Sequence, residues 1–343
     1  MTMAKKNNIL ITGIAGFIGF HLANRLLKDG EYHIIGIDNL NDYYNRKLKL
    51  DRLRELDLQV PGDEKINQSC SSSDITFYHL SIEDYSALTK VMEKHKPTIV
   101  IHLAAQAGVR YSIVNPHAYA QSNLVGFLNM QEVCRAYPVE HFLYASSSSV
   151  YGMNEKIPYS ESDPVDKPVS IYAATKRANE LMAHTYSHLY KVPATGLRFF
   201  TVYGPWGRPD MAYFSFTERI LKNDTIEIYG YGAPERDFTF VDDIVIGIIN
   251  LIDKPPIGET PARILNIGNN QPIPLREFIA TLESVISRNA IKKEVPMQAG
   301  DVLKTFADVT LISELTGFKP NTSLKDGLQH FWNWYKDYYK IKY

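Results

Sequence analysis

The chain has 343 residues, of which 45% are hydrophobic and 22% charged, the composition of an ordinary soluble globular protein. Lysine and arginine number 37 and aspartate and glutamate 38, so the net charge is −1, which argues against a nucleic-acid or membrane-surface partner because both favour a basic excess. The two cysteines, Cys70 and Cys134, are too few for a disulfide framework or a metal cluster, and we expect no metal.

The N-terminal segment "MTMAKKNNILITG" passes from polar residues straight into an apolar run with glycine. It lacks the longer apolar region and small-residue cleavage site of a signal peptide. Apolar stretches elsewhere fall short of the roughly 20 residues that span a bilayer. The sequence therefore predicts a cytoplasmic protein.

Short apolar runs rich in β-branched residues alternate with segments of 3.6-residue apolar periodicity through the first two hundred residues. Continuous apolar strands separated by helices are typical of a parallel sheet covered on both faces, so we expect an α/β fold with a doubly wound parallel sheet. The expected strands are 8–13, 33–38, 76–80, 98–105, 141–147 and 194–202, and the expected helices include 17–29, 84–95, 119–137 and 172–190.

Two regions break this alternation. Residues 55–75 are polar and turn-rich, which predicts a surface loop before the third strand. After residue 203 proline and glycine become frequent, which predicts a smaller C-terminal lobe, although 264–268 still has the pattern of a sheet strand. We expect a first domain of residues 1–200 plus about 236–268, and a second lobe of about 201–235 plus 269–343.

Three glycines, Gly13, Gly16 and Gly19, lie between the first strand and the first helix with the spacing GxxGxxG. Glycines there permit a tight turn and let backbone N–H groups approach a pyrophosphate at the helix N-terminus, although they also occur where a strand and a helix merely pack closely. Asp38 ends the second strand, 19 residues after Gly19. A carboxylate at that place accepts hydrogen bonds from a ribose diol and repels a 2′-phosphate, so the pattern predicts NAD rather than NADP.

The stretch "YAATKRANELMAHTYSHLY" begins with Tyr172 and has Lys176 four positions later, on the same helix face after a plausible N-cap at Ser170. A free phenol has a pKa of roughly 10, and a neighbouring ammonium together with a nicotinamide cation would favour the phenolate. Such a phenolate can accept a sugar hydroxyl proton as hydride leaves for NAD. A serine from "YASSSSVYG", which follows the fifth strand, would hold the same oxygen.

The same spacing occurs at Tyr43/Lys47 and at Tyr338/Lys342. The first pair lies in a charged helix and the second in the aromatic C-terminal segment, so we expect both to be structural. His102 and Cys134 are interpreted as packing residues, and Arg198 as structural.

With the glycines, Asp38, the serine run and Tyr-x-x-x-Lys in this order, the chain resembles the extended short-chain dehydrogenases/reductases. Within them it is most similar to the nucleotide-sugar 4-epimerases, particularly the UDP-glucuronate 4-epimerases of the NAD-dependent epimerase/dehydratase family. The resemblance covers almost the whole chain, and its most specific stretches are 102–112, 143–152, 172–190, 196–212 and 236–244.

The resemblance implies Rossmann-type NAD binding by the first domain, nucleotide-sugar binding by the smaller lobe, and a proton relay. Tyr172 would be the proton acceptor, Lys176 its partner on the nicotinamide ribose, and Ser147 the catalytic hydroxyl. Many relatives have an aspartate near the adenine where this chain has Ser81. The implied cofactor-binding residues are Gly13, Gly16, Phe17, Ile18, Gly19, Asp38, Asn39, Asn41, Ile82, Leu103, Ala104, Ala105, Asn123, Tyr172, Lys176 and Phe199.

The resemblance also implies a set of substrate contacts. Arg236 would bind the UDP diphosphate, Asp301 the uridine ribose, and Tyr229 would lie near the uracil. The full implied set is Ser147, Ser148, Ser149, Thr201, Arg208, Tyr229, Arg236 and Asp301.

The serine run favours 4-epimerisation. Dehydratase and decarboxylase relatives place acidic residues before "VYG", whereas this chain has four serines without an ionisable group. Thr201 stands where galactose-type epimerases carry asparagine, and the planar fork of Arg208 matches a carboxylate, so we expect a uronate substrate. Arg208 is alternatively a surface or diphosphate-binding arginine.

Other activities stay open at this point. The alternatives are 4-epimerisation of UDP-glucose or of N-acetylated hexosamines or uronates, for which the small Thr305 would leave room, decarboxylation of UDP-glucuronate, and non-catalytic NAD(H) binding. Relatives commonly pair two helices from each subunit, here 119–137 and 172–190, so we expect a homodimer.

Overall fold

The computed structural model describes residues 7–59, 68–297 and 303–342. The chain folds into two compact units. Unit 1 comprises Met1–Val150, Pro168–Arg198 and Ile248–Leu265, and unit 2 comprises Tyr151–Lys167, Phe199–Gly247 and Asn266–Tyr343. The expected domains and these units differ mainly for residues 151–167 and 236–247, which lie in unit 2 because their strands and bridges pair with unit 2 segments.

A mostly parallel sheet forms unit 1, and its described residues make eight strands in the order β11-β7-β6-β5-β1-β2-β4-β3. Neighbours from β4 to β6 pair in parallel, and β3 runs antiparallel at the edge. This confirms the expected doubly wound α/β fold. The strands are β1 Asn7–Thr12, β2 Tyr32–Asp38, β3 Gln68–Ser72, β4 Ile75–His79, β5 Ile99–His102, β6 His141–Ser147, β7 Ala194–Phe199 and β11 Ala262–Ile267.

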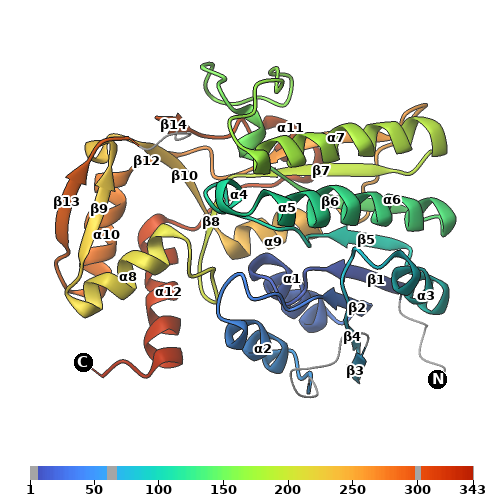
Figure 1. Ribbon diagram of the computed structural model, residues 1–343, viewed down its shortest axis with the longest axis horizontal. Helices are drawn as coiled ribbons and strands as arrows, with labels where there is room; N and C mark the ends of the chain where they lie inside the picture. Colours follow the sequence, from blue (N-terminus) through green and yellow to red (C-terminus); the bar gives the residue numbers. More distant parts are fainter. Residues whose placement is uncertain (1–6, 60–67, 298–302, 343) are drawn as a thin grey trace. The chain divides into compact units, whose positions relative to one another are not determined.

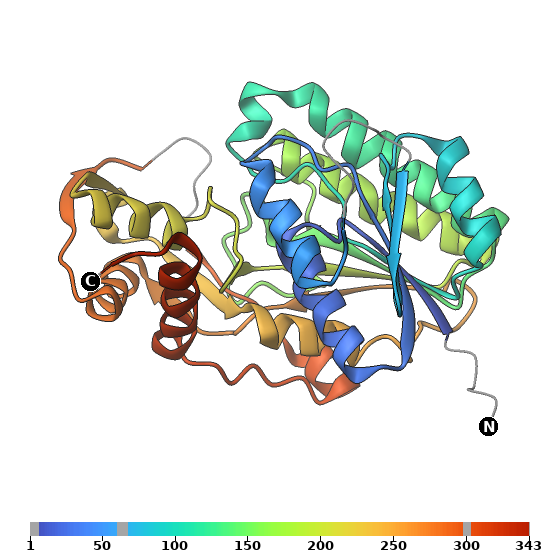
Figure 2. The same ribbon diagram turned by 90° about the horizontal axis from the view of Figure 1, so that it is seen from below.

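Helices cover both faces of this sheet, which is why its central strands are continuously apolar. Figure 2 shows α3, α6 and α7 side by side, away from α1 and α2. Their bounds are α1 Phe17–Asp29, α2 Arg46–Glu55, α3 Tyr85–His95, α6 Phe127–Ala136 and α7 Ile171–Tyr190, with α4 Tyr111–Val114, α5 Pro116–Tyr119 and the π-helix η1 Ala120–Gly126 before α6 (Figure 1).

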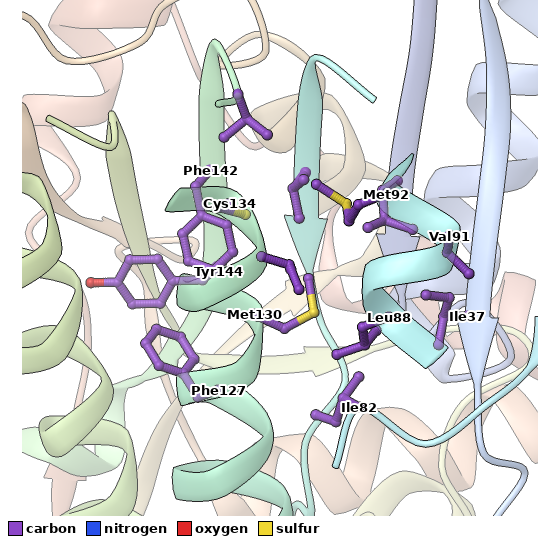
Figure 3. Packing of buried hydrophobic residues seen from close by; sticks show 14 of the residues in the cluster. Ile37, Ile82, Leu88, Val91, Met92, Phe127, Met130, Cys134, Phe142 and Tyr144 are labelled. Atoms are coloured by element: carbon purple, nitrogen blue, oxygen red, sulfur yellow. The ribbon is translucent and has the colours of Figure 1, made fainter. Parts of the chain in front are cut away.

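The core under α3, α6 and α7 is an aromatic and aliphatic cluster (Figure 3). Phe142 and Tyr144 of β6 stack at 5.6 Å and meet Phe127 of α6 edge-on. Cys134 is 1% exposed, and burial raises the pKa of its thiol. His102 stacks on Phe142, and burial lowers its pKa to about 3, so the ring is neutral. The packing interpretation of Cys134 and His102 is confirmed.

Unit 2 contains a four-stranded sheet of described residues, a separate two-stranded pair and a helical layer. The sheet comprises β8 Thr201–Tyr203, β10 Glu235–Phe240, β12 Pro272–Pro274 and β14 Lys304–Thr305, and the pair is β9 Thr225–Tyr229 with β13 Ile291–Val295. The helices are α8 Ala212–Lys222, α10 Leu275–Ile286, α11 Thr310–Thr316 and α12 Leu324–Tyr339, with α9 Val241–Ile249 continuing into unit 1, and the 3-10 turns are η2 Ser148–Tyr151 and η3 Gly230–Gly232.

The two rival tyrosine–lysine pairs have packing and surface contacts, although the expected helical position of Tyr43 was wrong, since α2 begins at Arg46 and the Tyr43 ring packs on Tyr111 at 4.9 Å. Tyr338 packs on Trp206 and Trp334 in the aromatic cluster of α12. Lys47 pairs with Asp51 one turn along α2 at 2.5 Å. In the part of the chain that the structure describes, no helix combines the length and apolar character that crossing a membrane requires.

Three sequence-based boundaries were wrong. The expected loop 55–75 contains the edge strand β3, whose serine-rich sequence gives no apolar signal because β3 is held by backbone pairing with β4 and by a hydrogen bond from the Ser71 hydroxyl to that of Thr76 at 3.2 Å. The expected strand 194–202 is divided into β7 and β8, since β8 pairs with β10 of unit 2. The expected strand 98–105 ends at His102, where the backbone turns beside the glycine loop.

Candidate functional site

The loop between β1 and α1 presents bare backbone, because its glycines lack side chains. A side chain at any of the three glycines would fill the space beside that backbone. Gly13 has φ +74°, and a Cβ built on it would lie 2.7 Å from the backbone nitrogen of Ala104. A Cβ on Gly16 would lie 2.9 Å, and one on Gly19 2.2 Å, from the carbonyl oxygen of Gly13. Helix α1 begins directly after Gly16 without an acidic side chain in its first turn, where Phe17 and Ile18 contribute N–H groups. These features fit a pyrophosphate.

Asp38 lies beside this loop at the end of β2 and is 7% exposed. Its Oδ2 accepts a hydrogen bond from the Ala15 amide at 3.1 Å, and its Oδ1 accepts one from the Leu40 amide at 2.8 Å. Each carboxylate oxygen has a second lone pair, so the oriented group can still accept from two ribose hydroxyls. Of the following residues, Asn39 accepts from the Asn41 amide at 3.2 Å, and Asn41 accepts from Lys49 at 2.6 Å.

The chain after β5 meets the glycine loop. The Leu103 amide donates to the carbonyl oxygen of Thr12 at 3.1 Å, and the Ala104 amide donates to the hydroxyl of Thr12 at 3.2 Å. The structure therefore brings Leu103, Ala104 and the partly buried Ala105 to the same sheet edge as Gly13.

Asn123 lies in the π-helix η1 and is 2% exposed. Its side chain accepts from the Gln106 amide at 2.8 Å and donates to the Gln106 carbonyl and to the Thr175 hydroxyl, each at 3.0 Å. Thr175 in turn donates to the carbonyl of Tyr172 at 2.8 Å. Asn123 thus connects the chain after β5 to the first turn of α7. Ile82 packs close to Gly126 at the end of η1, where an added Cβ would lie 2.6 Å from the Ile82 side chain.

The proposed proton-handling residues come from β6 and α7. Ser170 caps α7 by accepting from the Ala173 amide at 3.1 Å, which fixes the start of the helix one residue before Tyr172. Lys176 Nζ donates to the carbonyl oxygen of Ala145 at 2.8 Å, two residues before Ser147 on β6. The Tyr172 ring packs edge-on against Tyr119 at 6.0 Å. One hydrogen bond therefore ties Lys176 to the strand end that carries Ser147.

The hydroxyl group of Ser147 is placed to donate a hydrogen bond. Its Oγ accepts from the Ser149 amide at 3.2 Å and from the Ser149 hydroxyl at 2.9 Å. Two accepted hydrogen bonds leave the hydroxyl proton of Ser147 for a third partner. Ser148 and Ser149 lie in the turn η2 immediately after it.

Lys176 is 3% exposed, and burial lowers its pKa to about 8, while the nearby Glu180 acts in the opposite direction. A lysine with a pKa of about 8 is mostly an ammonium at neutral pH. Because this buried ammonium is poorly solvated by water, it stabilises a negative charge that forms close to it.

Sequence reasoning missed the partners of Arg198 and the role of Glu180. Arg198 donates from Nε and Nη2 to the two oxygens of Glu180 at 2.8 and 2.9 Å, which confirms the structural interpretation of Arg198. Glu180 also accepts from Ser146 at 2.6 Å. The available signal was the position of Glu180 four residues after Lys176, on the same face of a helix.

Several of the implied substrate residues belong to unit 2. Thr201 opens β8 opposite Phe238 of β10. Arg236, two residues earlier on β10, lies opposite Thr305 of β14 and donates to the Glu235 carbonyl at 2.9 Å. Tyr229 ends β9, and its hydroxyl donates to Glu227 at 2.6 Å. Phe199 ends β7, and Asp301 lies outside the described residues.

Arg208 already has a carboxylate partner. Its Nε and Nη2 donate to the two oxygens of Asp210 at 3.0 and 2.5 Å. The side chains of Arg208 and Asp210 are 23% and 33% exposed, so the pair is accessible to solvent. The guanidinium fork is therefore arranged for bidentate binding of a carboxylate.

Asp237 is a further residue that sequence reasoning missed. It is fully buried next to Arg236 and accepts from the amides of Asn269, Asn270 and Ala307 at 2.7 to 3.0 Å. It thus holds two separate backbone segments of unit 2, residues 269–270 and Ala307, at the start of β10.

Three known proteins are similar to this chain over almost its whole length. CapI of Staphylococcus aureus is 49% identical, over 97% of this chain and 99% of CapI. A probable UDP-glucuronate 4-epimerase of Rhizobium meliloti is 46% identical, over 96% of this chain and 97% of that protein. The crystal structure of UDP-glucuronic acid 4-epimerase from Bacillus cereus, in complex with UDP-glucuronic acid and NAD, matches with a TM-score of 0.87 at 31% identity, over 97% of this chain and 100% of that one.

A family model described as the NAD dependent epimerase/dehydratase family matches residues 9–268. This range contains the glycine loop, Asp38, the serine run, and Tyr172 with Lys176. The cofactor of the chain is accordingly NAD, and its sheet is of the Rossmann type found in short-chain dehydrogenases. The chain belongs to the NAD dependent epimerase/dehydratase family.

Proposed function

We propose that this protein is an NAD-dependent 4-epimerase of UDP-sugars that interconverts UDP-glucuronate and UDP-galacturonate. The observation that carries the proposal is the sheet edge where Lys176 is tied to β6 beside a run of four serines. That run contains a proton donor but no ionisable group, as suits an enzyme that removes and returns one hydride and one proton without further acid–base chemistry.

The residues of the glycine loop would hold the pyrophosphate of NAD, and Asp38 the adenosine ribose. Leu103, Ala104, Ala105 and Asn123 would shape the adjoining wall. NAD supplies a hydride acceptor that later returns the hydride to the sugar. All other steps belong to side chains of the protein.

Tyr172 would accept the proton of the C4 hydroxyl as its phenolate. The Lys176 ammonium, buried next to it on α7, would stabilise that phenolate. Ser147 would donate a hydrogen bond to the C4 oxygen, keeping its own proton, and so hold the resulting 4-keto sugar in place. Return of hydride to the opposite face then requires the keto sugar to turn over, with Tyr172 giving the proton back.

The proposed sugar class is supported by Thr201 and Arg208. We propose that the guanidinium of Arg208 exchanges Asp210 for the substrate carboxylate, with Thr201, Ser148 and Ser149 offering hydroxyls to the sugar. A 4-keto uronate loses CO₂ when its C5–carboxylate bond aligns with the carbonyl π system. Holding the carboxylate away from that alignment would allow epimerisation without decarboxylation. Arg236, Tyr229 and Asp301 would bind the UDP part.

The direct test is incubation with UDP-glucuronate, UDP-glucose and UDP-N-acetylglucosamine, with products identified by NMR. UDP-galacturonate as the main product supports the proposal. Release of CO₂ would identify a decarboxylase. Preferred turnover of a neutral or N-acetylated sugar would favour the second candidate, for which the small Thr305 opposite Arg236 leaves space.

Replacing Arg208 by glutamine should selectively impair uronate turnover. A charged hydrogen-bonding pair contributes roughly 1.5–3 kcal/mol, so we expect kcat/KM for UDP-glucuronate to fall about 10- to 150-fold while turnover of a neutral sugar changes little. Arg276→Gln is the matched control, since Arg276 also pairs with a carboxylate of unit 2, Glu294, at 2.5 Å. Equal losses for uronate and neutral sugar would refute the carboxylate assignment.

We also propose a homodimer formed through the outer faces of α6 and α7. Leu128 and, at the end of η1, Val125 are 41% and 42% exposed, while Leu181 and Leu189 of α7 are 53% and 58% exposed. The two helices pack against each other, as Figure 1 shows, so these side chains lie on neighbouring elements. Apolar side chains gathered on adjoining helices are typical of subunit interfaces.

The double variant Leu128→Lys/Leu181→Lys should therefore be monomeric, because it would place up to four ammonium groups in the interface. Light scattering after gel filtration measures this. Ile257→Lys, at a position 91% exposed in unit 1, is the control and should leave the mass unchanged. A wild-type monomer, or a double variant that remains dimeric, would contradict the proposed interface.

A further inference from the structure

A buried carboxylate lies one helical turn beyond Lys176. Glu180 of α7 is 3% exposed and accepts hydrogen bonds from three residues. Arg198 of β7 donates to both of its oxygens at 2.8 and 2.9 Å, Ser146 of β6 donates to Oε1 at 2.6 Å, and Arg177 donates to Oε2 at 3.0 Å. A fully desolvated carboxylate with this many donors is rigidly held.

These contacts sit directly behind the proposed proton-handling residues. Ser146 immediately precedes Ser147, and Lys176 donates to the carbonyl of Ala145 at 2.8 Å. Helix α7 is thus tied to two consecutive residues of β6, Ala145 and Ser146, by two hydrogen bonds, one from Lys176 and one to Glu180. The spacing between Lys176 and Ser147 depends on both bonds.

Glu180 also supplies the negative charge that acts on the pKa of Lys176. Burial lowers the pKa of Lys176 to about 8, and Glu180 is the charge that opposes this change. The other titratable groups around the lysine are uncharged or positive: His102 of β5 is neutral, burial raises the pKa of Tyr144 of β6 so that it stays a phenol, and Arg198 of β7 is a cation. Apart from Tyr172, these elements offer Lys176 no second anion among the described residues.

We propose that Glu180 is a positioning residue of the proton-transfer site, which fixes the spacing of Lys176 and Ser147 and stabilises the Lys176 ammonium. This inference rests on the proposed roles of Tyr172 and Lys176. It assigns Glu180 no contact with substrate or cofactor. Its effect is exerted through the strand end that carries Ser147 and through the charge of the lysine.

The test is the pH profile of kcat for Glu180→Gln with UDP-glucuronate. Glutamine keeps the shape of the side chain and one acceptor for Ser146 but removes the charge. The pKa of Lys176 then falls further, so the ammonium is lost at lower pH and the alkaline limb of the profile, which reports the coupled Tyr172–Lys176 pair, moves to lower pH. We expect a shift of about one pH unit, equivalent to about a tenfold loss of activity on the alkaline side.

Glu180→Gln leaves Arg198 buried without its anion, which could unfold the protein. The double variant Glu180→Gln/Arg198→Met removes that unpaired charge. It provides a second folded protein in which the pH of the alkaline limb of the kcat profile can be measured. Glu132→Gln is the matched control, because Glu132 of α6 also accepts a hydrogen bond from α7, through Tyr186 at 2.5 Å, ten residues beyond Lys176. The control should keep the wild-type profile.

A limb displaced to lower pH in either Glu180 variant supports the inference. A uniform loss of activity with an unmoved limb in both variants overturns it and leaves Glu180 a purely structural residue. Failure of the proposed function gives a different result. In that case the wild-type protein would not form UDP-galacturonate, or Tyr172→Phe would remain active, whatever the Glu180 variants do.

Discussion

Replacing Tyr172 by phenylalanine should reduce kcat for UDP-glucuronate about 10²- to 10⁴-fold, the range of positioned general acid–base groups. Phenylalanine keeps the ring that packs edge-on against Tyr119 at 6.0 Å and removes only the phenol oxygen. Folding and NAD content should therefore stay close to wild type. The measurements are single-turnover hydride transfer, followed by the absorbance of NADH, and the amount of NAD in the purified protein.

Tyr186→Phe provides the comparison on the same helix. Its hydroxyl donates to Glu132 on α6, so the substitution removes a tyrosine hydrogen bond away from the sheet edge. We expect near wild-type turnover from it. Equal activity of the two variants would remove Tyr172 from the mechanism and revive a non-catalytic NAD(H)-binding role.

Replacing Gly13 by alanine should weaken NAD binding by about 100-fold or more, equivalent to about 2.7 kcal/mol. A side chain at φ +74° is strained by roughly 1–2 kcal/mol. In addition, the new Cβ would approach the Ala104 nitrogen to 2.7 Å and the Leu103 carbonyl carbon to 2.9 Å, and both atoms are backbone. The glycine loop must then move away from the residues after β5, which distorts the backbone that would bind the pyrophosphate. Calorimetric titration with NAD measures the effect.

Gly30 gives an unusually close control. It has the same φ of +74° at the end of α1, but an added Cβ would meet nothing within 4 Å. Gly30→Ala therefore carries the backbone strain without the collision. It should lose only about 1–2 kcal/mol of unfolding free energy and bind NAD normally. Should Gly13→Ala bind NAD as well as Gly30→Ala does, close backbone approach would not be what the first glycine provides.

Periodicity located the helices well wherever one face is buried and the other solvated. The predicted helix 17–29 has the bounds of α1, and 172–190 differs from α7 by one residue. The continuous apolar runs of β1 and β5 correctly indicated a sheet covered on both faces. These features are local, since each depends on residues one or two turns apart.

Features that depend on distant partners were not predicted. The strand β3 carries serine, glutamine and cysteine, and is a strand only because β4 offers its edge. The helix predicted over 119–137 is interrupted by the π-helix η1, in which the carbonyl of Asn123 accepts from Asn179 of α7 at 2.6 Å. The apolar periodicity of this segment does not indicate such a partner, because the partner lies 56 residues away along the chain.

The same distinction applies to the site. The glycines, Asp38 and Tyr172 with Lys176 follow from spacings within short stretches, and the structure brings the glycines together with Asp38 and with the residues after β5. The contacts of Glu180 with Ser146 and Arg198 join three elements and emerge only in the fold. The pairing of Arg208 with Asp210 could have been noticed, since the two residues are separated by one proline.

Asp38 has a consequence for any exchange of coenzyme. One of its oxygens accepts from Ala15 within the glycine loop and the other from Leu40. An asparagine in its place would turn an NH₂ group toward one of those amides, so two donors would face each other and the loop would lose an anchor. Preference for the unphosphorylated nucleotide is thereby coupled to the conformation of the polypeptide that binds it. Redesign toward NADP would have to supply a new acceptor for the Ala15 or Leu40 amide as well as a cation for the extra phosphate.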